Sequence, residues 1–339
     1  MVTIKDVAKL AGVSIATVSR VVNENGYVSP VLEVRVRAAI ETLGYQPNIL
    51  ARHLRRSESL TLGMLIPNSA NPFFAEMATA VEEVCFGQGF TVALCNTNES
   101  SERAIAHFTT LFQHRVAGFI VVATAGLHSY MQQVLDGGYP IVLVDRPLPA
   151  LATDAVVSDN QAGAEQALRH LIELGHRRIG LILGAFSLET IRSRWAGIVE
   201  ALTQAGIPIE ADLIYDEGNY LAPTGYVGAE VLLNRPNPPT AIFAFNDLMA
   251  MGVLNYAYTH GIEIPHQLSV VGFDDITMAC YAVPPLTTIS QPKYELGKSA
   301  AELLLRRIGG EQTAPVYRIL PTQLMVRAST APNLRAIDL

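Results

Sequence analysis

Residues 3–22, TIKDVAKLAGVSIATVSRVV, combine two short amphipathic stretches with the hydroxyl groups that can begin helices. Thr3 and Ser14 each precede one stretch, where a hydroxyl accepts a hydrogen bond from a helix N–H group that has no intrahelical partner. Gly12 permits a tight turn between them. Such a pair of helices forms a helix-turn-helix, whose second helix fits the major groove of DNA. Taken alone, the motif also fits an ordinary helical hairpin.

The titratable and nucleophilic residues form no recognisable catalytic or metal-binding pattern. The sequence has no GxSxG, GxxxxGK[ST], HExxH or CxxC motif, and its eight histidines are scattered. Cys85, Cys95 and Cys280 lack zinc-ligand spacing. Asp274 and Asp275 alternate sides of an extended segment, which makes them a poor acid–base pair. We therefore expect a protein that is not an enzyme, with no catalytic residue, metal or cofactor.

The charge is unevenly distributed along the 339 residues. Residues 1–60 contain eight Lys/Arg and five Asp/Glu, which gives a net charge of +3. The whole chain has a net charge of −7, so the remaining residues have a net charge of −10. A small basic segment on a large acidic protein fits nucleic-acid binding by that segment alone. The acidic Asp6 argues against a secretory signal, no apolar run is long enough for a membrane span, and unpaired cysteines favour a cytoplasmic protein.

A third helix is predicted over residues 30–43, because Pro30 suits a first helical position. Its residues expected to pack on the first two helices are Val31, Val34, Ala38 and Leu43. Residues 48–56 form a short arginine-rich amphipathic stretch that is too short to be stable alone.

From residue 60 onward, apolar strand-like runs alternate with longer helical stretches. This alternation predicts a parallel sheet covered on both faces, and it restarts near Gly163, which indicates two similar halves with a cleft between them. The predicted strands are 61–66, 91–94, 118–123, 141–144, 179–183, 213–215, 241–244 and 269–273. The predicted helices are 72–88, 101–114, 130–136, 163–174, 192–205, 222–233 and 247–260.

The whole chain resembles the lac-repressor (LacI/GalR) family of bacterial transcription regulators. The motifs that carry the resemblance are TIKDVAKLAGVS, ATVSRVVN, GYQPN, ARHLR, NPFFAE, LIELGHRRIG, FAFNDLMAMG, SVVGFDD and PPLTTISQP. The part after residue 60 is also similar to periplasmic sugar-binding proteins of the ribose type. The resemblance implies an α/β protein with an all-α helix-turn-helix head and a bilobed, doubly wound, parallel-sheet body.

The resemblance also implies domain boundaries. The DNA-binding domain would span residues 1–46, and a hinge helix and linker would span residues 47–59. The ligand-binding and dimerisation body would span residues 60–339. Its N-lobe would contain about 60–161 plus 292–321, and its C-lobe about 162–291 plus 322–339.

By resemblance, the helix over residues 15–22 enters the major groove. Ile15 and Ala16 are apolar and would touch thymine methyl groups, whereas Arg20 would form a bidentate pair with guanine. Leu54 of the hinge helix would wedge into the minor groove. The full implied DNA-binding set is Thr3, Ser14, Ile15, Ala16, Thr17, Ser19, Arg20, Asn23, Ala51, Leu54 and Arg55.

The ribose-binding type implies the ligand-binding residues of the cleft. Aspartates would accept hydroxyl hydrogen bonds, arginines would donate in planar forks, and aromatic rings would sandwich the sugar. The set is Asn71, Phe73, Phe74, Asp145, Arg146, Arg194, Tyr220, Asn246, Asp274 and Gln291. Purine-binding members tend to have tryptophan after the strand aspartate, so Arg146 favours a sugar. Residues 122–126 lack an asparagine of the ribose-binding type, which leaves a hexose or a pentitol open.

The expected protein is a cytoplasmic, nucleoid-associated, homodimeric repressor that binds a pseudo-palindromic double-stranded operator and no membrane. A small sugar, with ribose or another pentose or hexose as the best candidate, would close the cleft and release DNA. Co-repression by ligand and docking of a phosphoprotein are alternatives within the family, and the motifs do not fix the sign of the ligand effect. A sugar-transport protein is a further alternative, which the basic head disfavours. The tail after Met325 has no leucine heptad, which disfavours a tetramer.

Overall fold

The computed structural model describes residues 4–23, 28–43, 60–184 and 188–333. The chain divides into two compact units, Met1–Ser59 and Leu60–Leu339, which are called the head and the body.

The described part of the head is a cluster of three helices. They are α1 (Ile4–Ala11), α2 (Ile15–Asn23) and α3 (Pro30–Leu43). Gly12 ends α1 with a φ of +62°, a conformation that glycine adopts without strain. Arg35 of α3 donates from Nη2 to the Ala11 carbonyl at 2.6 Å, which satisfies a carbonyl at the end of α1. The predicted helix-turn-helix is confirmed.

The buried face of α3 differs from the predicted one. Val31 and Val34 are 69% and 68% exposed, and Ala38 is exposed too, so the prediction that these three pack on α1 and α2 is wrong. The core instead contains Val36 and Ala39, with Ile40 against it, and Leu43 packs there as predicted. Both sets have the i, i+3, i+7 spacing of a helix face. The apolar residues of α3 thus lie on two faces, and periodicity alone chose the exposed one.

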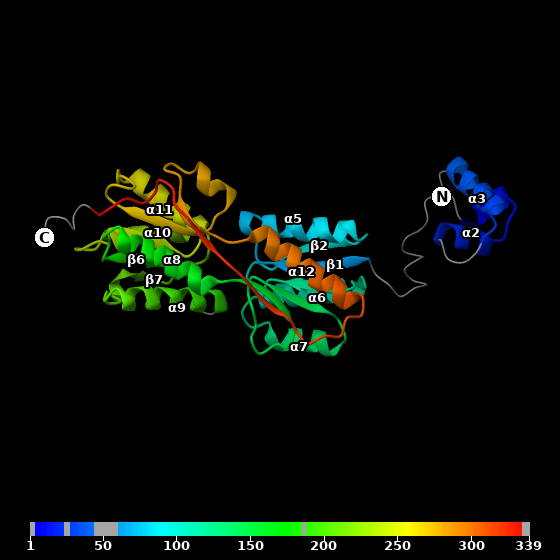
Figure 1. Ribbon diagram of the computed structural model, residues 1–339, viewed down its shortest axis with the longest axis horizontal. Coiled ribbons are helices and arrows are strands. Elements are labelled where there is room, and N and C mark those ends of the chain that lie inside the picture. The colour runs from blue at the N-terminus through cyan, green and yellow to red at the C-terminus, as the bar shows by residue number, and fades with distance from the viewer. Residues whose placement is uncertain (1–3, 24–27, 44–59, 185–187, 334–339) are drawn as a thin grey trace. The chain divides into compact units, whose positions relative to one another are not determined.

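The first lobe of the body contains a six-stranded parallel sheet in the order β11-β5-β4-β3-β1-β2. Its strands are β1 (Thr61–Ile66), β2 (Thr91–Asn96), β3 (Phe119–Val121), β4 (Ile141–Val144), β5 (Asp154–Ser158) and β11 (Tyr317–Leu320). Helices α5 (Pro72–Gly87) and α12 (Lys293–Ile308) pack together on one face, and α6 (Ser101–Gln113) and α7 (His128–Asp136) lie across the other (Figure 1). Burial on both faces explains why strands such as β4, IVLV, are continuously apolar.

The second lobe repeats this plan with the strand order β12-β10-β9-β8-β6-β7, in which only β12 pairs antiparallel. Its strands are β6 (Ile179–Ile182), β7 (Ile214–Tyr215), β8 (Ala241–Ala244), β9 (Ser269–Asp274), β10 (Thr287–Ser290) and β12 (Gln323–Met325). Its helices are α8 (Asn160–Glu173) and α9 (Glu189–Gln204), which pack together, and α10 (Ala222–Leu233) and α11 (Asp247–Thr259), which form a second pair. Short 3-10 turns are η1 (Ala211–Leu213) and η2 (Thr277–Tyr281).

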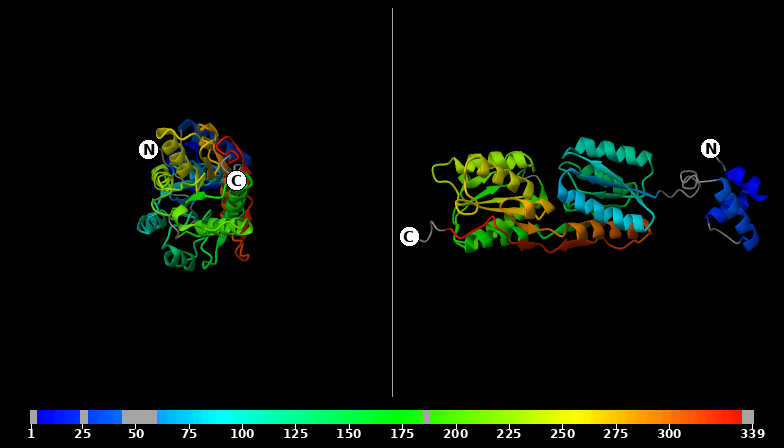
Figure 2. Two further views of the ribbon diagram at one scale, coloured as in Figure 1. Left: turned by 90° about the vertical axis from the view of Figure 1, so that its left-hand side faces the viewer. Right: turned by 90° about the horizontal axis from the view of Figure 1, so that it is seen from above.

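The chain passes between the two lobes three times, after β5, after β10 and after β11. The segment from α12 through β11 to β12 runs along one side of both lobes, as the orange-to-red ribbon of Figure 2 shows. The predicted pair of doubly wound halves is confirmed. Within the described ranges, no helix is both long and apolar enough to cross a membrane.

Candidate functional site

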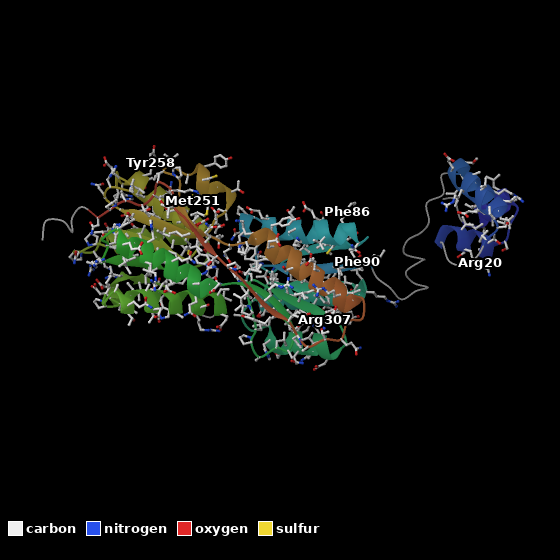
Figure 3. The ribbon with its side chains drawn as sticks, viewed as in Figure 1. Arg20, Phe86, Phe90, Met251, Tyr258 and Arg307 are labelled. Carbon is white, nitrogen blue, oxygen red and sulfur yellow. The ribbon has the colours of Figure 1, made fainter. Side chains whose placement is uncertain are left out.

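The start of α2 presents the predicted DNA-contacting residues. Ser14 Oγ accepts from the Thr17 backbone N–H at 3.1 Å and lies 2.9 Å from Thr17 Oγ1, so the predicted cap of this helix forms. Ile15 is 43% exposed, and Ala16 and Arg20 are also exposed (Figure 3). An exposed isoleucine at a helix start is available to an apolar partner such as a thymine methyl group.

Of the other residues of the predicted DNA-binding set, the structure describes only some. Ser19 is half-buried, and Asn23 is the last residue of α2. Thr3, Ala51, Leu54 and Arg55 lie outside the described residues. The hinge helix over residues 47–59 and its leucine wedge therefore stay predictions.

A cavity of about 490 Å³ lies between the two lobes of the body, and all ten predicted ligand-binding residues line it. These residues come from both lobes. Most lie just after a strand or at the start of a helix, where open α/β sheets bind ligands, whereas Arg194 is in the second turn of α9 and Tyr220 is in the loop before α10. The volume is in the range of small-molecule sites. The structure therefore brings the whole predicted set together.

On the first lobe, the start of α5 contributes Asn71, Phe73 and Phe74. Asn71 Oδ1 accepts from the Phe73 backbone N–H at 3.0 Å, so this side chain caps the helix. The rings of Phe73 and Phe74 meet edge to face with centroids 5.1 Å apart. Both rings are nearly buried and form an apolar wall.

The other polar group of this lobe is the Asp145–Arg146 pair after β4. Both side chains are buried, at 5% and 7% exposure. Arg146 Nη1 and Nη2 donate to the two carboxylate oxygens of Glu99 at 2.7 and 2.8 Å, and Arg146 Nε lies 3.7 Å from Asp145 Oδ2. Burial lowers the pKa of Arg146, but Glu99 and then Asp145 outweigh burial and raise it.

The aromatic rings enclose Arg146 as well as the cavity. The guanidinium carbon lies 5.9 Å from the centroid of Phe74 and 5.7 Å from that of Tyr220, which are distances of a cation–π contact. Arg146 thus contacts two of the three rings that were expected to sandwich the sugar. Tyr220 lies against Gly184, where a Cβ would come within 2.6 Å of the tyrosine ring, so this approach requires glycine.

On the second lobe, Arg194 of α9 is anchored by protein acceptors. Its Nε donates to Asn160 Oδ1 at 2.8 Å, its Nη1 donates to the Phe245 carbonyl, and its guanidinium carbon lies 3.7 Å from the Phe273 centroid. Its Nη2 lies 3.9 Å from Asp274 Oδ1. Burial lowers the pKa of Arg194, and the nearby Asp274 and Asp145 only partly offset this effect.

Asp274 lies at the end of β9 and accepts from Gln291 Nε2 at 2.7 Å. Burial raises the pKa of this carboxyl group to about 7, against the opposing effects of Arg194 and the Gln291 hydrogen bond. Burial likewise raises the pKa of Asp145. Within the described residues, Asp145 Oδ1 and Gln291 Oε1 are buried acceptors without a hydrogen-bond partner. A ligand with hydroxyl donors would satisfy both.

Asn246, a predicted ligand-binding residue, is also the N-cap of α11. Its Oδ1 caps α11 by accepting from the Met249 backbone N–H at 2.7 Å, and its Nδ2 donates to the Tyr220 carbonyl at 2.9 Å. Both polar atoms are therefore used by the protein, although the residue lines the cavity.

Sequence reasoning missed several lining residues, among them Asn68, Asn98, Glu99, Thr190 and Asn219. Glu99 is the most consequential, because it binds Arg146. A signal for it existed: it follows β2, and the ends of parallel strands face the ligand. The described residues contain no group of three His, Cys, Asp or Glu side chains able to hold a metal ion.

Comparisons with known proteins match both units. Residues 3–48 match the model of "Bacterial regulatory proteins, lacI family", and residues 168–330 match that of "Periplasmic binding protein-like domain". The HTH-type transcriptional repressor PurR of Aliivibrio salmonicida (strain LFI1238) is 38% identical over 91% of this chain and 92% of its own length.

Solved structures agree with these sequence matches. The lac repressor dimer bound to operator and the anti-inducer ONPF is similar at a TM-score of 0.88 and 29% identity, over 97% of this chain and 99% of that one. A LacI-family regulator of Enterococcus faecium with bound ribose is similar at 0.74 and 32%, over 80% of this chain and 99% of that one. The chain therefore belongs to the lacI family and is a transcriptional repressor with a DNA-binding head and a periplasmic-binding-protein-like body.

Proposed function

We propose that the cavity of this repressor binds a small neutral sugar, and that the sugar lowers the affinity of the head for its operator. The observation that carries the proposal is the pair of buried acceptors without a partner, Asp145 Oδ1 and Gln291 Oε1, in a cavity with aromatic walls. Each sugar hydroxyl taken from water needs a hydrogen-bond partner, and the C–H faces of the ring need apolar contact. The cavity offers both and would bind the sugar without turnover.

The charges of the cavity favour a neutral ligand. The charged side chains that line it are two guanidinium groups, Arg146 and Arg194, and three carboxylates, Glu99, Asp145 and Asp274. These groups largely cancel one another, so the cavity has no excess of positive charge for a phosphate group. The structure of a family member with bound ribose supports a pentose as the first candidate.

A homodimer would couple the cavity to DNA. Phe86 of the first lobe and Tyr258 of the second are 74% and 85% exposed and lie on the same side of the body (Figure 3). Aromatic residues are enriched at protein interfaces, and we place the dimer contact on this side for that reason. Closure of the cleft would rotate the paired first lobes, and the hinge over residues 47–59 could then no longer pair on a pseudo-palindromic operator.

By linkage, operator binding would weaken sugar binding by the same factor. We expect the repressor to act at the chromosome in the cytoplasm.

A purine that acts as a co-repressor is the second candidate. The flat rings of Phe74 and Tyr220, which line the cavity from opposite lobes, would suit a planar base. By the resemblance, purine-binding members tend to have tryptophan at the position of Arg146. The arginine therefore favours the sugar.

The test is the melting temperature of the purified protein against pentoses, hexoses, polyols, sugar phosphates and purines. A ligand at 100 times its Kd stabilises the folded state by about 2.7 kcal/mol, which is a clear shift. Fluorescence anisotropy on an operator selected from random DNA then gives the sign of the effect. A neutral sugar that stabilises the protein and weakens operator binding is the expected result. A response to purines alone, or stronger operator binding with sugar, would overturn the proposal.

A further inference from the structure

Glu99 reaches the cavity from a loop with an unusual backbone. Asn98 and Glu99, which follow β2, have φ values of 51° and 58° in the left-handed region. Non-glycine residues rarely adopt this conformation, and a consecutive pair is less common still. The Asn98 backbone N–H donates to the Pro67 carbonyl at 2.9 Å, which ties the loop to the end of β1. This backbone positions the Glu99 carboxylate against Arg146.

We propose that Glu99 determines the charge class of the effector, because it occupies the Arg146 guanidinium that would otherwise bind an anionic group such as a phosphate. This inference rests on the proposed ligand-binding role of the cavity. The sequence predicted no role for Glu99, and it predicted that the guanidinium group of Arg146 would donate to the ligand. The structure places the fork on Glu99 in a two-point contact, at 2.7 and 2.8 Å.

The fork of Arg146 is the part of the residue that recognises anions. A guanidinium group binds a carboxylate or a phosphate through two parallel N–H bonds, and the geometry for both is the same. A phosphate in the cavity would therefore compete with Glu99 for the same two nitrogens. The competition is unequal, because the carboxylate belongs to the chain and is already in place.

Other carboxylates add to this rejection. A phosphate near Arg146 would lie close to Asp145, whose Oδ2 is 3.7 Å from Arg146 Nε. A neutral hydroxyl group does not need the fork and can donate to Asp145 Oδ1, which has no partner among the described residues. The pair thus admits a polyol and rejects the same polyol bearing a phosphate.

Glu99 is exposed enough that a substitution can remove its charge without disturbing the core. Its side chain is 38% exposed, whereas that of Arg146 is 8% exposed. Glu99→Gln would therefore remove a partly solvated charge and leave a buried guanidinium group facing the cavity without an anionic partner from this loop. An incoming phosphate would then supply the missing charge.

The experiment measures the binding of inorganic phosphate, ribose 5-phosphate and ribose to the full chain by calorimetry. Wild type is expected to show no saturable phosphate binding, and Glu99→Gln is expected to bind phosphate and ribose 5-phosphate at least about tenfold more tightly than wild type. Glu102→Gln is the matched control, because this exposed carboxylate of the same region contacts Ser100 and leaves Arg146 alone. Melting curves establish that each variant is folded.

Two further variants keep the proposal testable. Glu99→Asp keeps the charge and should still reject phosphate, whereas Glu99→Gln combined with Arg146→Met should lose the gain. A folded Glu99→Gln protein without a gain, a gain that survives Arg146→Met, or an equal gain in Glu99→Asp would each overturn the proposal. Inorganic phosphate reports on the gate whichever sugar binds, so failure of the sugar assignment would show separately, as wild type that binds no neutral sugar.

Discussion

The two walls of the cavity contain the same pair of charged side chains in different electrostatic settings. On the first lobe, Asp145 and Arg146 are joined by Glu99, whose carboxylate takes both terminal nitrogens of the arginine. On the second lobe, Arg194 and Asp274 are 3.9 Å apart, and the arginine donates mainly to neutral acceptors, Asn160 Oδ1 and the Phe245 carbonyl. Arg146 thus has two carboxylates beside it, Glu99 and Asp145, whereas Arg194 has the more distant carboxylate of Asp274 beside it.

The pKa values follow this difference. Glu99 outweighs burial and raises the pKa of Arg146, whereas burial lowers the pKa of Arg194. Burial also raises the pKa of Asp274 to about 7, so this carboxyl group titrates near neutral pH. Glu99 thus neutralises the arginine of the first wall, where Asp145 Oδ1 has no hydrogen-bond partner among the described residues. On the second wall, the ionisation of Asp274 changes near neutral pH, so the contribution of this wall to stability depends on pH.

Removal of Arg194 should give the largest effect, because its hydrogen-bond partners are buried. We expect Arg194→Met to lower the free energy of unfolding by about 3 kcal/mol, and to weaken sugar binding roughly a hundredfold. Arg146→Met should cost less stability, since Glu99 can turn to solvent. Chemical denaturation and calorimetry measure both. Arg192→Met, an exposed arginine on the same helix, is the control. A larger loss for Arg146→Met would break the comparison.

The second effect is a pH dependence that originates on the second wall. Between about 4 and 7, folded Asp274 holds a proton that the unfolded chain has released, so its contribution to the unfolding free energy falls as pH rises and is level above about 7. Arg194, Lys293, Asp145 and Asp247 surround this group. Asp274→Asn should therefore flatten the stability profile from pH 5 to 7.

Denaturation at several pH values measures this slope. Asp145→Asn should flatten the profile less, because Asp145 lies beside Arg146 and Arg194. Asp216→Asn, at an exposed aspartate of the second lobe, is the control. Equal flattening by Asp145→Asn and Asp274→Asn would show that the two walls titrate alike.

Much of the fold was predictable because its elements have simple patterns. The predicted bounds of β1, β4, β8 and α10 match the structure, since a buried parallel strand is a short apolar run between polar turns. Strand β5 was missed. It begins with Asp154, which reads as a turn residue, yet Arg307 holds this carboxylate at 2.7 Å from 153 positions away. Helix α12 was absent from the predicted series, although its pattern is that of an amphipathic helix.

The membership of the cavity was more predictable than the bonds within it. Strand ends and family motifs brought ten residues to one place, because topology fixes where they lie. The sequence did not show that the amide oxygens of Asn71 and Asn246 accept the hydrogen bonds of helix caps, or that Glu99 accepts hydrogen bonds from Arg146. These bonds depend on backbone angles and on contacts between distant segments, which periodicity does not encode.

The smallest expected effect is at a contact between the two lobes that lies outside the cavity lining. Glu76 of α5 accepts from Thr277 Oγ1 at 3.1 Å and lies 3.6 Å from Lys293 Nζ, which also donates to the Asp274 and Asp275 carbonyls. The Glu76 side chain is 39% exposed, so Glu76→Gln should cost less than about 1 kcal/mol of stability and change sugar affinity only a few-fold.

Calorimetry against the same sugar measures this change, with Glu83→Gln of the same helix as the control. A tenfold loss would mean that the closed arrangement of the lobes depends on this exposed contact. Sugar affinity would then depend on the Glu76 contact between the lobes, and the difference between the two buried walls would not determine it.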